Sequence, residues 1–375
     1  MSDIPLIFFA GGGTGGHLYP GVAVAEALRT TFPEAKPVFL CTTREIDRVI
    51  LQPTGFEFLP QPIVPPTASI NGLLGFWKSW RETNDKVKEL LRQRKPVAVL
   101  GLGGYAASVA VRLAAKKYRI PTALLNPDAI PGKANLYLMP WVKAVCCQFE
   151  VTGQYVSPKY RAKLAMTGCP IRSDFRNLPP REQAAANLMV EPNLRTLVVT
   201  GASQGAKTVN EAVLELWRTV TLRGWQILHL AGRDQADWVR AGYRELGIAA
   251  RVIDFTPAMA DVWAVADLAI SRSGASSCAE MTACGVPSIL MPYPFHKDMH
   301  QKANGKVLAD AGAAILVDDQ KNPKKNCEVL KPIVESLLYD LNKRQAMVAA
   351  ARKLGRPDAA EDVANKITQM ARSSR

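Results

Sequence analysis

Short apolar runs alternate along the chain with longer segments whose apolar residues recur at helical spacing. In the first half the runs are PLIFFA, KPVFLC, PVAVLGLGG, PTALLN and AVCCQF. After residue 165 the rhythm begins again with TLVVTGASQG, QILHLAG, ARVIDFT, DLAISRSG, PSILMPY and AAILVDD. Strands without polar alternation are buried on both faces, which is typical of parallel sheets covered by helices. The pattern predicts an α/β protein with two doubly wound, Rossmann-like domains that face each other across a cleft.

The length of 375 residues suits two such domains. We expect an N-terminal domain over residues 1–166 and a C-terminal domain over 167–355. The last helical stretch, 356–375, is a candidate to pack back on the first domain. Between the two series, AMTGCPIRSDF (165–175) contains a glycine and a proline and is the predicted hinge.

Charge and cysteine usage narrow the functional classes. The chain has 47 basic and 33 acidic residues, a net charge of +14, which favours an anionic partner. The N-terminal stretch MSDIPLIFFA lacks a basic leader, and no run approaches the roughly 20 apolar residues that cross a bilayer. Seven scattered cysteines without C-x-x-C spacing are typical of free thiols in a reducing cytosol. We therefore expect a cytoplasmic protein without a disulfide framework or a metal site.

The stretch FFAGGGTGGHLYPGVAVAEALR (8–29) places five glycines and a threonine between an apolar run and a helical one. Gly11, Gly13 and Gly16 satisfy G-x-G-x-x-G. A nicotinamide site also needs an acidic residue at the end of the next strand, where CTT stands and Glu45 comes late. The loop is instead predicted to bring a phosphate to the N-terminus of a helix.

Two segments in the second half also place glycine and small polar residues directly after an apolar run. GASQGAKT (201–208) departs from the ATPase phosphate loop because Ala206 replaces its second glycine. SRSGASSCAE (271–280) offers Arg272 for charge and Glu280 one turn into a helix. Since a carboxylate repels phosphate, Glu280 is predicted either to accept hydrogen bonds from a ribose diol or to complement the helix dipole. There is no D-x-D motif, so a metal held by paired aspartates is not indicated.

Together these motifs resemble the bacterial MurG family, which adds N-acetylglucosamine to lipid-linked N-acetylmuramoyl-pentapeptide. The matching residues follow the family's order from about residue 10 to residue 310: Gly12-Gly13-Thr14-Gly15-Gly16-His17, Gly103-Gly104-Tyr105, Ile130-Pro131-Gly132 with Asn135, Gly168-Cys169-Pro170-Ile171-Arg172, Ser203-Gln204-Gly205-Ala206, Arg272-Ser273-Gly274 with Glu280, and His296-Lys297-Asp298 with Gln301. The resemblance implies a GT-B glycosyltransferase.

The resemblance also implies the reaction, an inverting transfer from UDP-N-acetylglucosamine to an undecaprenyl-diphosphate-linked acceptor in peptidoglycan synthesis, a step tied to cell shape and division. The donor residues that it implies are Thr14, Gly15, Gly16, Asp128, Arg172, Ser203, Gln204, Phe255, Arg272, Ser273, Gly274, Ala275, Glu280, His300 and Gln301. The acceptor residues that it implies are Gly13, Thr14, Gly15, Gly16, His17, Gly104, Tyr105 and Asn135. No cofactor is required beyond the UDP-sugar substrate, and a divalent cation on the diphosphate stays open.

His17, the only histidine in the first 228 residues, follows the glycine loop directly. A neutral imidazole suits a general base that deprotonates the attacking hydroxyl, although His17 could instead orient the loop or cap the helix. Where the family usually has His-Glu-Gln-Asn, this chain has Leu-Asn-Pro-Asp, which makes Asp128 a second candidate for the base or an orienting group for His17. The family's Gln-Gln pair is His300-Gln301 here, which puts the contacts to the donor sugar in question.

The segment INGLLGFWKSWRETNDKVKELLRQRK (70–95) combines aromatic, apolar and basic side chains, which suits a helix on an anionic membrane surface. The membrane-facing candidates are Leu73, Leu74, Phe76, Trp77, Lys78, Trp80 and Arg81. The alternative is an amphipathic helix packed on its own sheet. We expect a peripheral protein on the inner face of the cell membrane, and no nucleic-acid partner because no recognition motif is present.

Two other functions stay open at this point. The departures at Asp128 and His300 suit another GT-B transferase that uses a different sugar or lipid acceptor. The same cleft could also serve a UDP-sugar epimerase or a sugar-nucleotide-binding protein that performs no transfer.

Overall fold

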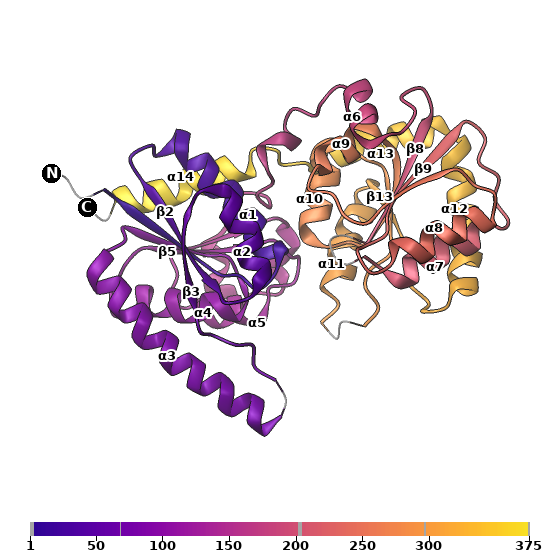
Figure 1. The fold of residues 1–375 in the computed structure, drawn as a ribbon. Coiled ribbons are helices and arrows are strands. Elements are labelled where there is room, and N and C mark those ends of the chain that lie inside the picture. The colour runs from indigo at the N-terminus through magenta and orange to yellow at the C-terminus, as the bar shows by residue number, and fades with distance from the viewer. Residues whose placement is uncertain (1–3, 68, 202–204, 296–297, 374–375) are drawn as a thin grey trace. The chain divides into compact units, whose positions relative to one another are not determined.

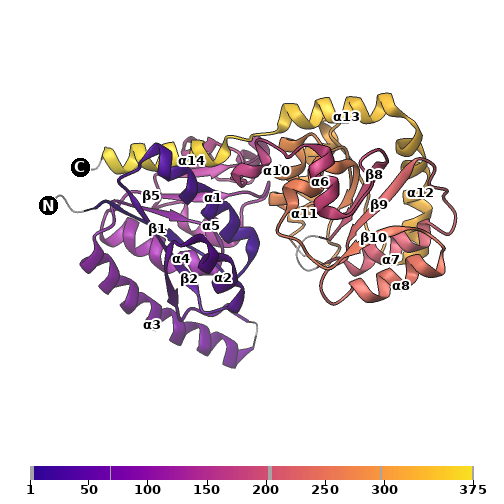
Figure 2. The same ribbon diagram turned by 45° about the horizontal axis from the view of Figure 1, so that its top comes forward.

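The protein consists of two compact α/β units. They are the N-terminal unit, Met1–Arg172 with Pro357–Arg375, and the C-terminal unit, Ser173–Arg356. The N-terminal unit extends to Arg172, beyond the expected boundary at residue 166, and it takes in the last helix. Figures 1 and 2 show helices around the sheet of each unit. The computed structural model describes residues 4–67, 69–201, 205–295 and 298–373.

The N-terminal unit is built on a seven-stranded sheet in the order β3-β2-β1-β4-β5-β6-β7. All neighbouring strands are parallel. The strands are β1 (Leu6–Ala10), β2 (Lys36–Thr42), β3 (Glu57–Gln61), β4 (Ala98–Gly101), β5 (Thr122–Asn126), β6 (Ala144–Cys147) and β7 (Leu164–Met166). The apolar runs predicted the five inner strands, whereas β3 and β7 were not expected. Both lie at the edges, β3 contains Pro60, and β7 occupies the start of the predicted hinge.

Helices cover both faces of this sheet because successive strand residues alternate between two cores. Phe9 and Phe39 belong to one core, with α1 and α14 over it, while Phe8 and Val38 belong to the other, with α3 and α4 over it. The helices and helical turns of the unit are α1 (Gly15–Thr31), α2 (Glu45–Leu51), η1 (Gln52–Thr54), α3 (Ile70–Arg94), α4 (Gly104–Arg112), η2 (Leu113–Lys117), α5 (Lys133–Leu138), η3 (Glu150–Gln154), η4 (Pro158–Lys163) and α14 (Ala359–Arg372).

The last helix, α14, lies against α1 in the N-terminal unit (Figures 1 and 2). Its residues Val363, Ile367 and Met370 are three to four positions apart, so they lie on one helical face, and all three are buried in the core beneath α1. The chain therefore returns to its first unit after completing the second.

The C-terminal unit is built on a six-stranded parallel sheet in the order β10-β9-β8-β11-β12-β13. Its strands, all of them among the predicted runs, are β8 (Arg195–Thr200), β9 (Trp225–Leu230), β10 (Ala250–Ile253), β11 (Ala266–Ser271), β12 (Ser288–Leu290) and β13 (Ala314–Leu316). Its helices and turns are η5 (Ser173–Phe175), α6 (Arg181–Leu188), α7 (Lys207–Leu216), α8 (Ala236–Glu245), α9 (Met259–Val265), α10 (Ala275–Cys284), α11 (His300–Asp310), α12 (Pro323–Tyr339) and α13 (Leu341–Leu354).

Each of the two sheets has a switch point, where the order of its strands reverses. In the first sheet the strand order reverses between β1 and β4, and in the second between β8 and β11. Ligands of open parallel sheets bind beyond the carboxyl ends of the strands at such a switch point. The glycine loop follows β1 and the loop 271–274 follows β11, so each candidate loop lies at the switch point of its unit. Within the described residues, no helix is long and apolar enough to cross a membrane.

Candidate active site

Asp47, a fully buried residue of α2, holds the glycine loop of the N-terminal unit in place. The Gly13 N–H donates to Asp47 Oδ1 at 2.7 Å, and the N–H and hydroxyl of Thr42 both donate to Oδ2 at 2.7 Å. A Cβ on Gly12 would stand 2.2 Å from Oδ2, so a side chain there would displace the carboxylate. The loop is therefore held by a buried carboxylate that receives three hydrogen bonds.

Arg44 also holds the glycine loop in place. Its Nη1 donates to the Gly13 carbonyl at 2.8 Å, so both polar backbone groups of Gly13 are engaged within the protein. Neither Asp47 nor Arg44 was among the predicted site residues. The available signal was an acidic residue soon after β2. In a dinucleotide site an acidic residue at this place binds the ribose, but here Asp47 accepts a hydrogen bond from the glycine loop.

The imidazole of His17 lies between the glycine loop and the start of α4. Its Nδ1 is 3.1 Å from the hydroxyl of Thr14, which is the extended N-cap of α1. A Cβ on Gly104 would come within 2.9 Å of the His17 ring, and one on Gly103 within 3.3 Å. The Gly103-Gly104 pair, both at positive φ, thus makes room for the ring.

Burial lowers the pKa of His17 below its usual 6.5, against the opposing effects of a hydrogen bond with the Gly12 backbone and the negative charges of Asp128 and Asp47. Desolvation wins, and the imidazole is neutral at pH 7. A neutral imidazole can accept a proton. The structure therefore places a neutral imidazole at the loop.

Two asparagines support the loop that carries Asp128. Asn126 Nδ2 donates to the Asp128 carbonyl at 2.8 Å. Asn135 Nδ2 donates to the Leu125 carbonyl at 2.9 Å and to Asn126 Oδ1 at 3.0 Å. Asn135, predicted to contact the acceptor, is buried, and its amide nitrogen is used inside the protein. In this structure it orders the loop after β5 and thereby the Asp128 carboxylate that acts on His17.

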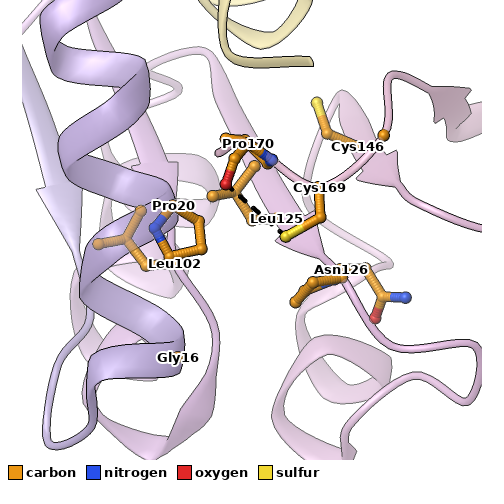
Figure 3. A pocket seen from close by; sticks show the side chains of 10 residues that line it. Gly16, Pro20, Leu102, Leu125, Asn126, Cys146, Cys169 and Pro170 are labelled. Carbon is orange, nitrogen blue, oxygen red and sulfur yellow. Dashed lines mark hydrogen bonds between the residues drawn. The ribbon is translucent and has the colours of Figure 1, made fainter. Parts of the chain in front are cut away.

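A narrow pocket lies beside the start of α1 (Figure 3). Its lining brings the glycine loop together with the end of β5 and the segment after β7: Gly16, Pro20, Leu102, Leu125, Asn126, Pro127, Cys146, Gly168, Cys169 and Pro170. Burial raises the pKa of the Cys146 thiol to about 12, so this cysteine is not a nucleophile at neutral pH. The described cysteines form no disulfides.

In the C-terminal unit, Arg272 is buried rather than open to a ligand. Its Nη1 donates to Asp319 at 2.9 Å and to the carbonyls of Met291 and Pro292 at 2.8 and 3.0 Å. Its Nη2 donates to the Thr208 hydroxyl at 2.7 Å. The guanidinium thus ties the end of β11 to the end of β12 and to the first turn of α7.

Glu280 and Ser273 also make contacts within the unit. Glu280 Oε2 accepts a hydrogen bond from the indole N–H of Trp263 at 3.1 Å, which fixes the carboxylate on α10. The hydroxyl of Ser273, a fully buried residue, donates to the Gln301 carbonyl at 2.7 Å. Gln301 Oε1 accepts from the Tyr293 N–H at 2.9 Å. Gly274 and Ala275 form the N-cap and the first residue of α10.

The remaining predicted donor residues lie at loop and helix ends. Phe255 is partly exposed with the Arg233 guanidinium over its ring, and Arg172 lies over the Tyr19 ring at 6.0 Å. His300 opens α11, and its Nε2 is 2.9 Å from Asp298 Oδ2. The predictions for Ser203, Gln204, His296 and Lys297 fall outside the described residues. No group of three or more metal-ligating side chains occurs within the described part of the chain.

Helix α3 presents two different faces. Thr83, Val87 and Leu91 are buried against the domain, and Phe76 and Trp80 pack partly on the same core. The other predicted membrane residues are exposed, with relative exposures of 45% for Leu73, 63% for Leu74 and 60% for Trp77, and Lys78 and Arg81 lie beside them. The helix thus packs on its own unit and also offers an apolar, basic surface to solvent.

Comparisons with known proteins identify the family of the chain. The chain matches the glycosyltransferase family 28 N-terminal domain over residues 7–147 and the family 28 C-terminal domain over 196–363. A UDP-N-acetylglucosamine--N-acetylmuramyl-(pentapeptide) pyrophosphoryl-undecaprenol N-acetylglucosamine transferase from Thermodesulfovibrio yellowstonii is 36% identical, across 95% of this chain and 96% of its own. The transferase of the same name from Halothermothrix orenii is 32% identical, across 98% and 100%.

Among solved structures, Acinetobacter baumannii MurG has a TM-score of 0.76 and 26% identity, across 97% of this chain and 99% of its own. The UDP-N-acetylglucosamine 2-epimerase from Neisseria meningitidis, solved with UDP-N-acetylglucosamine, has a TM-score of 0.68 at 14% identity, across 97% and 100%, and shares the fold alone. The likeness to the first structure and the two parallel sheets confirm the predicted fold class.

Proposed function

Because this chain belongs to the MurG family of glycosyltransferases, we propose that it moves N-acetylglucosamine from UDP-N-acetylglucosamine to an undecaprenyl-diphosphate-linked N-acetylmuramoyl-pentapeptide. The observation that carries the proposal is the imidazole of His17. It is neutral at pH 7, it lies at the rim of an anchored glycine loop, and the Gly103-Gly104 pair makes room for its ring.

The C-terminal unit binds the donor in this proposal. The N-terminus of α10 carries the positive end of the helix dipole, so it suits the diphosphate of UDP. The Glu280 carboxylate, fixed by the Trp263 indole, accepts hydrogen bonds from the ribose hydroxyls. Arg272 keeps the loop before α10 in place through Asp319 and the carbonyls after β12, and so acts on the donor indirectly.

The transfer is a single displacement that inverts the anomeric carbon. His17 removes the proton from the attacking acceptor hydroxyl while the bond to UDP breaks. Charge develops on the leaving diphosphate, and backbone N–H groups held in place before the reaction stabilise it most effectively. No step in this scheme needs a cofactor. Transfer is therefore expected to persist when a chelator removes divalent cations.

The substitution His17→Ala tests the base. We expect turnover to fall by about 10²–10⁴-fold, the usual range for a lost general base, while UDP-N-acetylglucosamine binding stays near normal. Initial rates measure turnover, and calorimetry measures the binding of UDP-N-acetylglucosamine. A small loss of rate would contradict the role of His17. A large loss in Asp128→Asn would then identify Asp128 as the base.

The acceptor is membrane-borne, so the protein needs a route to it. We propose that the exposed face of α3, formed by Leu73, Leu74, Trp77, Lys78 and Arg81, rests on the anionic inner surface of the cell membrane. Apolar side chains enter the interface there while basic side chains meet the lipid phosphates. The protein then works as a peripheral enzyme on the cytoplasmic side.

A further inference from the structure

Arg44 is a cation at the glycine loop that the proposed reaction has not yet used. It precedes α2, its side chain is exposed, and its Nη1 donates to the Gly13 carbonyl at 2.8 Å. Its own N–H donates to the Thr42 hydroxyl at 3.2 Å, which fixes the backbone from which the side chain extends. The guanidinium is therefore tied to the loop through one of its nitrogens, and its other N–H groups remain available as donors.

The charge of Arg44 is not neutralised within the described residues, where it forms no ion pair. The nearby Asp47 carboxylate already accepts three hydrogen bonds from Gly13 and Thr42. Arg48, the next arginine on the same segment, is instead paired with Glu45 at 2.8 Å. Arg44 thus keeps its full positive charge beside a loop whose other fixed charges, Asp47 and Asp128, are negative.

A second donor lies next to it. The Tyr105 hydroxyl is buried and has no hydrogen-bond partner among the described residues. It lies 3.4 Å from the point where a Cβ on Gly13 would stand, and the positive charge of Arg44 acts on it. The Arg44 guanidinium and the Tyr105 hydroxyl therefore flank Gly13, one residue before the N-cap of α1.

We propose that Arg44 binds the diphosphate of the lipid-linked acceptor, with Tyr105 as a second donor. This inference rests on the proposed function and adds a residue to it. A diphosphate that approaches this loop is repelled by the negative charges of Asp47 and Asp128. Backbone N–H groups carry only partial charge to offset this repulsion. A guanidinium supplies a full charge and donors that match phosphate oxygens. Its attachment to Gly13 places that charge before the substrate arrives, which lowers the cost of ordering the side chain.

The test compares Arg44→Gln with the control Arg48→Gln on two acceptors with short prenyl chains, one diphosphate-linked and one monophosphate-linked. Arg44→Gln should raise the KM for the diphosphate acceptor by roughly 10- to 100-fold, since a charge-assisted hydrogen bond is lost. The rise should be much smaller for the monophosphate acceptor. Arg44→Lys should recover part of the affinity. Arg48→Gln should match the wild type, and the KM for UDP-N-acetylglucosamine should stay unchanged in every variant.

Three results would overturn the inference. An equal fall in kcat for both acceptors with unchanged KM would mean that Arg44 only shapes the loop. Weaker binding of UDP alone would mean that the guanidinium meets the donor diphosphate instead. Unchanged kinetics would remove Arg44 from the site. If the wild-type protein transfers no sugar, the proposed function fails by itself, and direct binding of the short-chain diphosphate acceptor to the wild type and Arg44→Gln still decides the role of Arg44.

Discussion

Asp47 connects the shape of the glycine loop to the protonation of His17. Its two oxygens accept from Gly13 and Thr42 at 2.7 Å, and its negative charge raises the pKa of His17 against the larger effect of burial. One side chain therefore influences both the position of the loop and the proton affinity of the base beside it.

The substitution Asp47→Asn separates these effects through a pH profile. Removing the negative charge destabilises the imidazolium, so the pKa of His17 falls further below 6.5. The base then stays neutral to lower pH, and the acid limb of log kcat/KM should move to lower pH. The maximum should also fall, because an amide offers one acceptor oxygen to three donors.

The control for this experiment is Asp85→Asn on α3, an exposed aspartate paired with Lys88, which should leave the profile unchanged. An acid limb that moves to higher pH in Asp47→Asn, or does not move while the maximum falls, would contradict electrostatic coupling between Asp47 and His17.

At the residue scale, the sequence indicates a candidate functional residue where its chemical type and its local motif together suggest a role. His17 after a glycine loop and Glu280 after a helix start are such cases. Asp47 and Trp263 were missed because their roles depend on contacts 34 and 17 positions away in the chain. For Arg272 the charge predicted a ligand contact, and the structure shows the guanidinium buried with Asp319; we propose that it positions the loop before α10.

At the level of elements, the helices and strands around Arg272 depend on one buried ion pair. Asp319 accepts from Arg272, from Asn326 Nδ2 at 2.9 Å and from the Lys321 N–H at 2.9 Å, so it joins β11 to the start of α12. Its side chain is fully buried, and that of Arg272 is nearly so.

The substitution Asp319→Ala should lower the free energy of unfolding of the C-terminal unit by about 3–5 kcal/mol, because it leaves a buried guanidinium without its counter-charge. The adjacent Asp318 offers a matched control, since its pair with Lys302 is largely exposed and Asp318→Ala should cost about 0–1 kcal/mol. Urea denaturation of both variants measures the difference. Equal losses would show that the buried pair does not support the unit.

Helix α3 carries the prediction about the membrane. The double substitution Leu74→Glu with Trp77→Glu removes two exposed apolar side chains and adds negative charge. It should weaken binding to vesicles that contain anionic phospholipid by at least about 10-fold, since burying each apolar side chain contributes roughly 1.5–3 kcal/mol.

Cosedimentation with vesicles measures this effect, and Val329→Glu on α12, another exposed apolar position, is the control. Turnover of a water-soluble acceptor should not change in the double variant. Undiminished vesicle binding would show that the membrane surface lies elsewhere on the protein.

The sequence predicts elements well where burial is symmetric. The inner strands of both sheets are continuous apolar runs, because each is covered on two faces. Edge strands β3 and β7 lack that signal, because their residues are mostly only partly buried and β3 contains Pro60. The edge strands β10 and β13 of the second sheet were nevertheless predicted. For α3, both sequence interpretations hold on different faces: aromatic residues Phe76 and Trp80 pack on the unit, whereas Trp77 faces solvent.

For the whole molecule, two parallel-sheet units each carry a loop and a helix start at the topological switch point. In our account the N-terminal unit supplies the base and the C-terminal unit supplies the donor site. In our account both substrates and the membrane surface are anionic, which suits the net charge of +14. The place of each candidate site follows from the topology, whereas side chains such as His300, which differs from the family pattern, are predicted to set the choice of sugar.

The most direct test of the account is product analysis with a panel of UDP-sugars and a lipid-linked N-acetylmuramoyl-pentapeptide acceptor in detergent micelles. We predict that UDP-N-acetylglucosamine is used in clear preference to the other donors and yields one UDP per β-linked disaccharide. Preference for another donor, or an altered or unchanged sugar nucleotide with no disaccharide formed, would contradict the account.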